Sequence, residues 1–196
     1  MRATDPNIIL ASSSVYRREL LARLGFAFRC QVADIDEAPL ENETPREVAV
    51  RLATEKAQSV ACNLESGLVI GSDQVADRNG QLLGKPGDPE TARQQLLACS
   101  GKQIRFYTAV SVVNAANNTI RQLLDTTTVS FRLLSEETVD RYIRRESALD
   151  CAGGFKSEGL GITLFEVIES DDPTALIGLP LISLTKLLRE EGIDLP

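Results

Sequence analysis

The sequence contains no histidine, so the residue that most often serves as a general base is missing. Serine–histidine and cysteine–histidine catalytic pairs are therefore excluded. An enzyme built on this chain must move protons with Asp, Glu, Lys, Tyr or a metal-bound water. Any metal site must be rich in oxygen ligands, which suits Mg²⁺ or Mn²⁺ better than zinc.

Long apolar runs and closely spaced cysteines are also missing. No run approaches the ~20 residues that a membrane-spanning helix needs. Met1 to Pro6 leads directly into an apolar run and has no signal-peptide pattern, so we expect a cytoplasmic protein with no membrane partner. The cysteines lie too far apart for zinc-type pairs, and we interpret them as reduced thiols used mostly in packing: Cys30, Cys62, Cys99 and Cys151.

The net charge of −7 argues against nucleic-acid binding, which needs a basic face. An anionic small molecule remains compatible with this charge, because a local cationic pocket can form in an acidic protein. The 196 residues are 43% hydrophobic and 25% charged, which favours a globular chain. We expect a single domain over residues 1–196.

Predicted helices and strands alternate along the chain, with one long hairpin near the middle. A capping box, Thr44-Pro45-Arg46-Glu47, opens a helix to about residue 63. The pattern predicts an α/β fold with a mixed sheet. The segment 162–168 is ambiguous. The other strands are expected at 7–11, 26–32, 68–74, 81–83, 104–113 and 119–133, and the other helices after Ser14 and at 88–100, 135–145 and 180–191.

A short apolar run ending in Gly71-Ser72-Asp73-Gln74 is the most informative segment. We expect a bend at Gly71 that places Asp73 where the strand leaves the sheet, the edge at which open α/β sheets bind ligands. A carboxylate there can hold a divalent metal or take a proton from water. Lys85, between Gly84 and Pro86, can meet a phosphate. A charged residue after a buried strand is also compatible with a plain surface position.

Two further segments combine possible phosphate or metal ligands. Ser12 to Arg18 lies at a strand-to-helix junction, where N–H groups, serine hydroxyls and arginines attract anions, although a plain serine cap explains it too. Asp34 to Glu37 gathers three carboxylates that can help hold a metal or form a solvated turn. On the capped helix, Arg51 and Lys56 should point in different directions.

The glycine-rich segment Cys151 to Gly159 can approach a ligand closely or form a flexible surface loop. Within it, Lys156 can bind phosphate. The carboxylate of Glu158 can accept hydrogen bonds from the N–H donors of a nucleotide base.

Taken in chain order, these segments resemble the Maf family over nearly the whole chain. No single motif is specific, but the ordered combination is. The resemblance begins at Leu10 to Leu21 and continues through Asp36-Glu37, Arg51-Leu52-Ala53 with Glu55-Lys56-Ala57, Gly71-Ser72-Asp73-Gln74, Gly84-Lys85-Pro86, Ser100-Gly101 with Tyr107-Thr108, and Ala152-Gly153 through Gly161.

The resemblance implies a nucleoside triphosphate pyrophosphatase that cleaves between the α- and β-phosphates with a divalent metal, Mg²⁺ or Mn²⁺. It implies a twisted mixed sheet flanked by helices, an elongated two-lobed Maf/ITPase-like architecture with a cleft, and often a homodimer. Asp73 matches the catalytic proton acceptor, and Glu37 with Asp73 matches the metal ligands. The substrate-binding positions are matched by Ser14, Arg17, Arg18, Lys56, Lys85 and Lys156.

The base-selecting positions of the family are occupied by Tyr16, Gln74 and Glu158. Members acting on dTTP and UTP usually show Arg, Thr and Gln there, and this chain resembles the branch that hydrolyses 7-methyl-GTP. A methylated guanine is cationic, so an aromatic face at Tyr16 can hold it, although tryptophan is the commoner residue there. Glu158 suits the N–H donors of guanine and repels the carbonyls of uracil and thymine. The alternatives are a pyrophosphatase for dTTP, UTP or other non-canonical nucleotides, and a non-enzymatic nucleotide-binding regulator of cell division.

Overall fold

The computed structural model describes residues 7–195 of the chain. The segment 1–6, on which the expectation about a signal peptide rests, lies outside the described residues. Within the described part, no helix combines the length and the apolar composition needed to cross a bilayer.

One mixed sheet forms the centre of the molecule, and its strands follow the order β2-β1-β3-β5-β6-β7, with β4 paired to β3. Strand β1 runs parallel to β2 and β3, and the remaining pairs are antiparallel. The predicted mixed α/β fold is confirmed. The strands are β1 Ile8–Leu10, β2 Arg29–Cys30, β3 Leu68–Arg78, β4 Gln81–Leu83, β5 Gln103–Asn114, β6 Thr119–Phe131 and β7 Phe165–Glu169.

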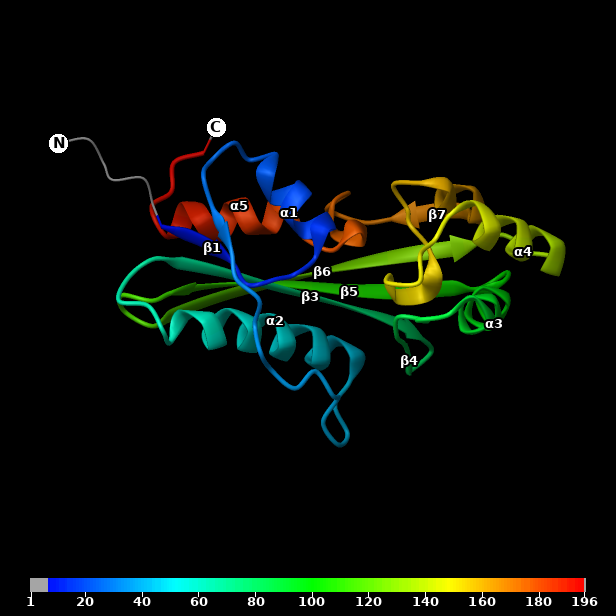
Figure 1. The fold of residues 1–196 in the computed structure, drawn as a ribbon, viewed down its shortest axis with the longest axis horizontal. Helices are drawn as coiled ribbons and strands as arrows, with labels where there is room; N and C mark the ends of the chain where they lie inside the picture. The colour runs from blue at the N-terminus through cyan, green and yellow to red at the C-terminus, as the bar shows by residue number, and fades with distance from the viewer. Residues whose placement is uncertain (1–6, 196) are drawn as a thin grey trace.

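Helices flank this sheet on both faces (Figure 1). Helix α2 lies along one face, α1 and α5 lie over the other, and α3 and α4 gather at the far end of the elongated molecule (Figure 1). The α-helices are α1 Val15–Ala22, α2 Pro45–Ala61, α3 Pro89–Cys99, α4 Glu136–Arg145 and α5 Leu181–Glu190; short 3-10 helices are η1 Ala152–Gly154, η2 Leu160–Leu164 and η3 Ala175–Ile177.

The hydrophobic core is divided between two lobes. The first lobe contains β1, β2, α1, α2 and α5, whose clusters include Leu10, Leu20 and Leu184. The second lobe contains α3, α4, β4, β7 and η1, packed around Phe106 and Phe155. Because β3 and β5 contribute to the clusters of both lobes, one sheet connects them. The two-lobed architecture is therefore confirmed, whereas the single domain over residues 1–196 stays a prediction.

Strand β3 differs from its prediction, because it continues through Asp73 to Arg78 instead of leaving the sheet. The bend expected at Gly71 is therefore wrong. A Cβ atom at Gly71 would lie 2.1 Å from the Ala53 carbonyl oxygen and 2.8 Å from the Ala57 nitrogen of α2. Glycine is needed here because α2 packs directly on the strand. Asp73 consequently lies in mid-strand and not at the carboxyl edge of the sheet.

Two other predicted elements also differ. The strand expected at 26–32 is reduced to Arg29–Cys30, because it pairs only with Ile9 and Leu10 of the three-residue strand β1. The ambiguous segment 162–168 divides into the end of η2 and strand β7. The predicted capping box of α2 is confirmed, since the side chains of Thr44 and Glu47 each bond the other's backbone N–H.

Replacing Gly71 tests the contact between α2 and β3. We expect Gly71→Ala to lower the free energy of unfolding by about 3 kcal/mol or more, because the added methyl group overlaps the α2 backbone. Gly84→Ala is the matched control, since its Cβ would meet nothing within 4 Å. Urea unfolding of both variants provides the measurement. Equal stability of the two variants would contradict the close packing.

Candidate active site

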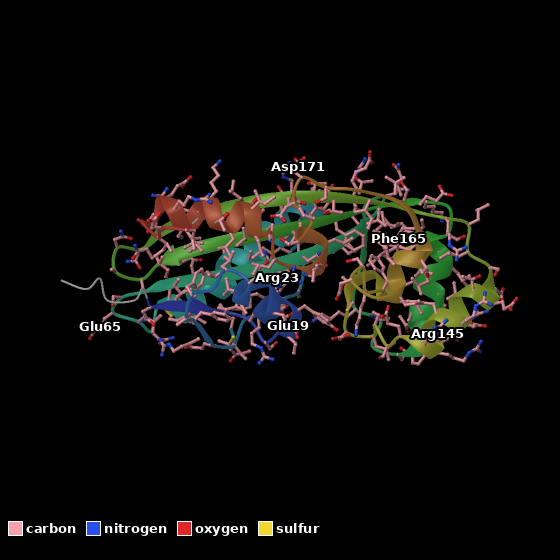
Figure 2. All side chains as sticks on the ribbon, turned by 90° about the horizontal axis from the view of Figure 1, so that it is seen from above. Glu19, Arg23, Glu65, Arg145, Phe165 and Asp171 are labelled. Atoms are coloured by element: carbon pink, nitrogen blue, oxygen red, sulfur yellow. The ribbon has the colours of Figure 1, made fainter. Side chains whose placement is uncertain are left out.

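A cleft of about 800 Å³ lies between the two lobes. Figure 2 shows α1, marked by the labelled Glu19 and by Arg23 directly after its last residue, on one side, and α4, which ends at the labelled Arg145, on the other. The lining comes from both lobes and includes nine of the site residues predicted from the sequence: Ser14, Tyr16, Arg17, Glu37, Lys56, Asp73, Gln74, Lys85 and Glu158.

Lys56 forms the centre of the charged part of the cleft. Its Nζ atom lies 2.7 Å from Asp73 Oδ1 and 3.0 Å from Glu37 Oε1. Lys56 and Asp73 are each only 7% exposed, so the carboxylate of Asp73 is paired where water is scarce. The ammonium reaches the strand because Gly71 lets α2 approach. The structure thus brings together three predicted residues from β3, α2 and the loop before α2.

Arg17 reaches the same region from α1. Its Nε donates to the Gly178 carbonyl oxygen at 2.8 Å, which directs the guanidinium over the sheet. The buried Ser72 hydroxyl lies 2.9 Å from the same carbonyl and 2.7 Å from that of Ala109. Burial lowers the pKa of Arg17, and the negative charges of Asp73 and Glu37 oppose this shift. The electrostatic fields of these acids therefore extend to the guanidinium.

Gln74 is fixed by the segment that contains η3. Its Nε2 lies 2.9 Å and 3.0 Å from the carbonyl oxygens of Ala175 and Leu176, and 3.1 Å from Thr108 Oγ1. The amide nitrogen is therefore committed to the protein. Only the amide oxygen of Gln74 remains to contact a ligand in the cleft.

Tyr16 and Lys156 meet across the cleft, one from each lobe. The Lys156 Nζ lies 5.4 Å from the centroid of the Tyr16 ring, within cation–π distance. The Tyr16 hydroxyl is 3.5 Å from Asp150 Oδ2. A hydrogen bond with Tyr16 raises the pKa of Lys156, so the ammonium is retained at neutral pH. Glu158, two residues after Lys156, is exposed and lines the cleft.

The remaining predicted residues differ in how close they come to this centre. Ser14 is the N-cap of α1, and its hydroxyl accepts from the Arg17 N–H. Lys85 is exposed in the loop after β4, whose Gly84 carbonyl accepts from Gln95. Arg18 is exposed on α1 and lies outside the cleft lining, as does Lys156. Arg51 points elsewhere, to Glu43 and Glu55, as expected from its helical spacing.

Three residues of the site were missed in the sequence. Asp150 and Cys151 line the cleft, and the carbonyl oxygen of Gly178 holds Arg17. Asp150 directly precedes the glycine-rich segment, and this place in the sequence could have identified it as a residue of the site. Gly178 has a φ of 121°, a conformation that favours glycine, but a backbone acceptor 161 residues from Arg17 leaves no local pattern.

The oxygen ligands present fit a divalent metal that binds together with a substrate. Among the described residues there is no cluster of three or more side chains that could hold a metal alone. Glu37 and Asp73 supply two carboxylates, and Mg²⁺ usually takes one or two carboxylates together with waters and substrate phosphates. The charged lining comprises four carboxylates and three cations, so a polyanion needs additional positive charge here.

Comparison with known proteins finds relatives over nearly the whole chain. A family model described as Maf-like protein matches residues 7–191. The 7-methyl-GTP pyrophosphatase of Xanthomonas campestris pv. campestris (strain 8004) is 53% identical over 191 residues, covering 97% of this chain and 99% of that protein. The protein of the same name from Xanthomonas oryzae pv. oryzae (strain MAFF 311018) is 53% identical over 191 residues, covering 97% of this chain and 100% of that protein.

A solved structure, that of the Staphylococcus aureus Ham1 protein, has the same fold. Its TM-score is 0.54 at 15% sequence identity, and the match covers 94% of this chain and 97% of that one. At this identity the likeness concerns the fold alone.

The four cysteines occupy different environments, and the expectation that most of them serve in packing is wrong. Cys99 is buried and Cys151 half-buried, but Cys30 and Cys62 are exposed. Burial raises the pKa of Cys99 to about 11, and burial together with the nearby Asp150 carboxylate raises that of Cys151 to about 12.

Thiol labelling tests these environments. A raised thiol pKa keeps the sulfur protonated, and only the thiolate reacts with iodoacetamide. At mildly alkaline pH we expect Cys30 and Cys62 to be labelled first, with Cys99 and Cys151 slower by about tenfold or more. Peptide mass spectrometry over time measures each rate. Labelling of Cys151 as fast as Cys30 would contradict its place in the cleft wall.

Proposed function

The chain belongs to the Maf-like protein family, and we propose that it hydrolyses 7-methyl-GTP to 7-methyl-GMP and diphosphate. The observation that supports this most is the contact of Lys56 with both Asp73 and Glu37 inside the cleft. This contact places an acid, which can accept a proton, next to a cation, which can bind phosphate. Such a reaction fits a house-cleaning role in nucleotide metabolism.

In this proposal Asp73 is the general base. Its Oδ1 accepts from Lys56, and we assign Oδ2 to the attacking water. Lys56 holds the carboxylate of Asp73 in a fixed direction, so the group is oriented to accept the proton. The water attacks a phosphorus atom, the bond between the α- and β-phosphates breaks, and diphosphate leaves.

The triphosphate would be held by groups that converge on Asp73. The first N–H groups of α1 have no intrahelical acceptor and favour an anion next to Ser14. Arg17, directed by Gly178, can offer the rest of its guanidinium to phosphate oxygens. Lys85 adds a cation from the second lobe. Arg18 can assist only from the rim, because it lies outside the lining.

A divalent metal, Mg²⁺ or Mn²⁺, would be held by Glu37 and Asp73 together with phosphate oxygens. When bound, such an ion neutralises charge that develops on the phosphates. Lys56 already contacts both carboxylates and would keep their orientation as they take up the ion.

The base would bind at the end of the cleft formed by Tyr16 and Glu158. Glu158 can accept from the N–H donors of guanine, and the free amide oxygen of Gln74 adds a second acceptor. Lys156 lies over the Tyr16 ring, and a cationic 7-methylguanine would compete with it for that ring. Displaced from the ring, the ammonium would be available to the phosphates.

Three further features are part of the proposal. We propose the cytoplasm as the location, consistent with the free thiols of all four cysteines. A homodimer is the expected assembly, and no nucleic-acid partner is expected.

The remaining alternatives are a substrate such as dTTP or UTP, and a nucleotide-binding regulator of cell division that binds without turnover. The charged contacts of Asp73 favour an enzyme over a binder.

Replacing Asp73 tests the reaction itself. We expect Asp73→Asn to lower kcat for 7-methyl-GTP by about 10²- to 10⁴-fold, because the amide cannot accept the proton. Asp77→Asn is the matched control, since Asp77 is equally buried on β3 but lies outside the cleft. Pyrophosphate release with Mg²⁺ or Mn²⁺, with and without EDTA, is the measurement. Unchanged turnover in Asp73→Asn would remove the proposed base.

Replacing Glu158 tests base selection. We expect Glu158→Gln to lower kcat/KM for 7-methyl-GTP by about tenfold while leaving UTP and dTTP hydrolysis equal or faster, because the amide no longer repels their carbonyls. The test is a panel of 7-methyl-GTP, GTP, UTP and dTTP. Equal wild-type rates on UTP and 7-methyl-GTP would reject the assignment of Glu158, and binding without turnover of any nucleotide would favour the regulator.

A further inference from the structure

The loop that carries Glu37 has few apolar anchors of its own. Residues 31–44, between β2 and α2, contain no helix or strand. Ala33 and Ile35 pack against the hydrophobic clusters of the first lobe, but every residue from 36 to 42 is exposed. The Glu37 side chain is itself 57% exposed. The place of this carboxylate therefore depends on polar contacts.

Arg51 on α2 supplies those contacts. Its Nε lies 2.6 Å from Glu43 Oε1 and its Nη2 lies 2.8 Å from Glu43 Oε2, a bidentate pair. The same Nη2 donates to the Ala38 carbonyl oxygen at 3.0 Å. Nη1 contacts Glu55 Oε2 at 3.1 Å within the helix, which orients the guanidinium. One side chain thus fixes both ends of the segment 38–43.

Glu43 also closes the turn inside this segment. Its Oε2 accepts from the Leu40 N–H at 2.9 Å, and its own N–H donates to the Leu40 carbonyl at 3.2 Å. The side chains of Arg51 and Glu43 are only 17% and 8% exposed, so the pair is shielded from solvent. Hydrogen bonds from Arg51 lower the pKa of Glu43, which keeps the pair ionised at neutral pH.

We propose that Arg51 and Glu43 form a positioning pair that places Glu37 at Lys56 and Asp73. This inference rests on the proposed function. Neither side chain lines the cleft, so the pair acts through the backbone of Ala38, the residue after Glu37. Loss of the pair should therefore change the properties that depend on Glu37 and leave the remainder of the site unchanged.

The chain contains a matched pair of substitutions for the test. Glu43→Gln and Glu55→Gln each remove one carboxylate from Arg51 and change the charge equally, but Glu43 belongs to the loop and Glu55 to the helix. Hydrogen exchange of the nucleotide-free protein is the first measurement. We expect the amides of residues 40 and 43, whose hydrogen bonds close the turn, to lose protection by about tenfold in Glu43→Gln and to keep it in Glu55→Gln.

Kinetics provide the second measurement. We expect Glu43→Gln to lower kcat, or to raise the metal concentration at half-maximal activity, by roughly ten- to a hundredfold, and Glu55→Gln to stay close to wild type. In a Glu37→Gln background, adding Glu43→Gln should change kcat by less than about twofold, because the group being positioned is already removed. An equal loss in both backgrounds would mean general destabilisation and would overturn the pair's role.

The two proposals fail in different ways. If the wild-type protein releases no pyrophosphate from any nucleotide of the panel, the proposed function is rejected. If Glu43→Gln leaves the exchange of the amides of residues 40 and 43 unchanged, the positioning pair is rejected whatever the activity of the enzyme.

Discussion

The single ammonium of Lys56, shared by Asp73 and Glu37, is the contact on which the site depends. Without it, a buried carboxylate on β3 would be left unpaired, which is far more costly than removing both partners. Lys56 reaches Asp73 only because α2 lies directly on β3, and that approach requires the missing side chain of Gly71. A glycine two residues before the acid is thus a structural condition of the chemistry.

The alternation of side chains along β3 distributes the rest of the site. Gly71 and Asp73 face α2, whereas Ser72 and Gln74 face the segment around η3. The first pair brings in the lysine. In the second pair, Ser72 bonds the Gly178 carbonyl that holds Arg17, and Gln74 bonds the carbonyls of Ala175 and Leu176. One four-residue motif therefore connects two sets of ligands on opposite faces of a strand. A shift of register by one residue would exchange the two sets.

Much of the fold could be predicted from local patterns, because caps, turns and the long hairpin are encoded by neighbouring residues. The capping box at Thr44 and Glu47 is an example. The prediction of a bend at Gly71 was wrong, because the sequence does not distinguish a glycine that lets a helix pack closely on a strand from a glycine that forms a turn. The resemblance supplied most site residues, but not their contacts. Lys56 and Asp73 lie 17 residues apart on different elements, and Gly178 acts through a carbonyl that has no residue-specific signature.

The long strands impose a limit on how the enzyme can respond to a nucleotide. β3 pairs with β5 from Leu68 to Asp77, and β5 pairs with β6 from Gln103 to Asn114, without interruption beneath the cleft. A hinge between the lobes would have to break these ladders. The spacing between Arg17 on one side and Lys85 on the other is therefore set by the stiffness of a continuous sheet, and adaptation to a ligand falls to side-chain rotations and to the loops at the rim.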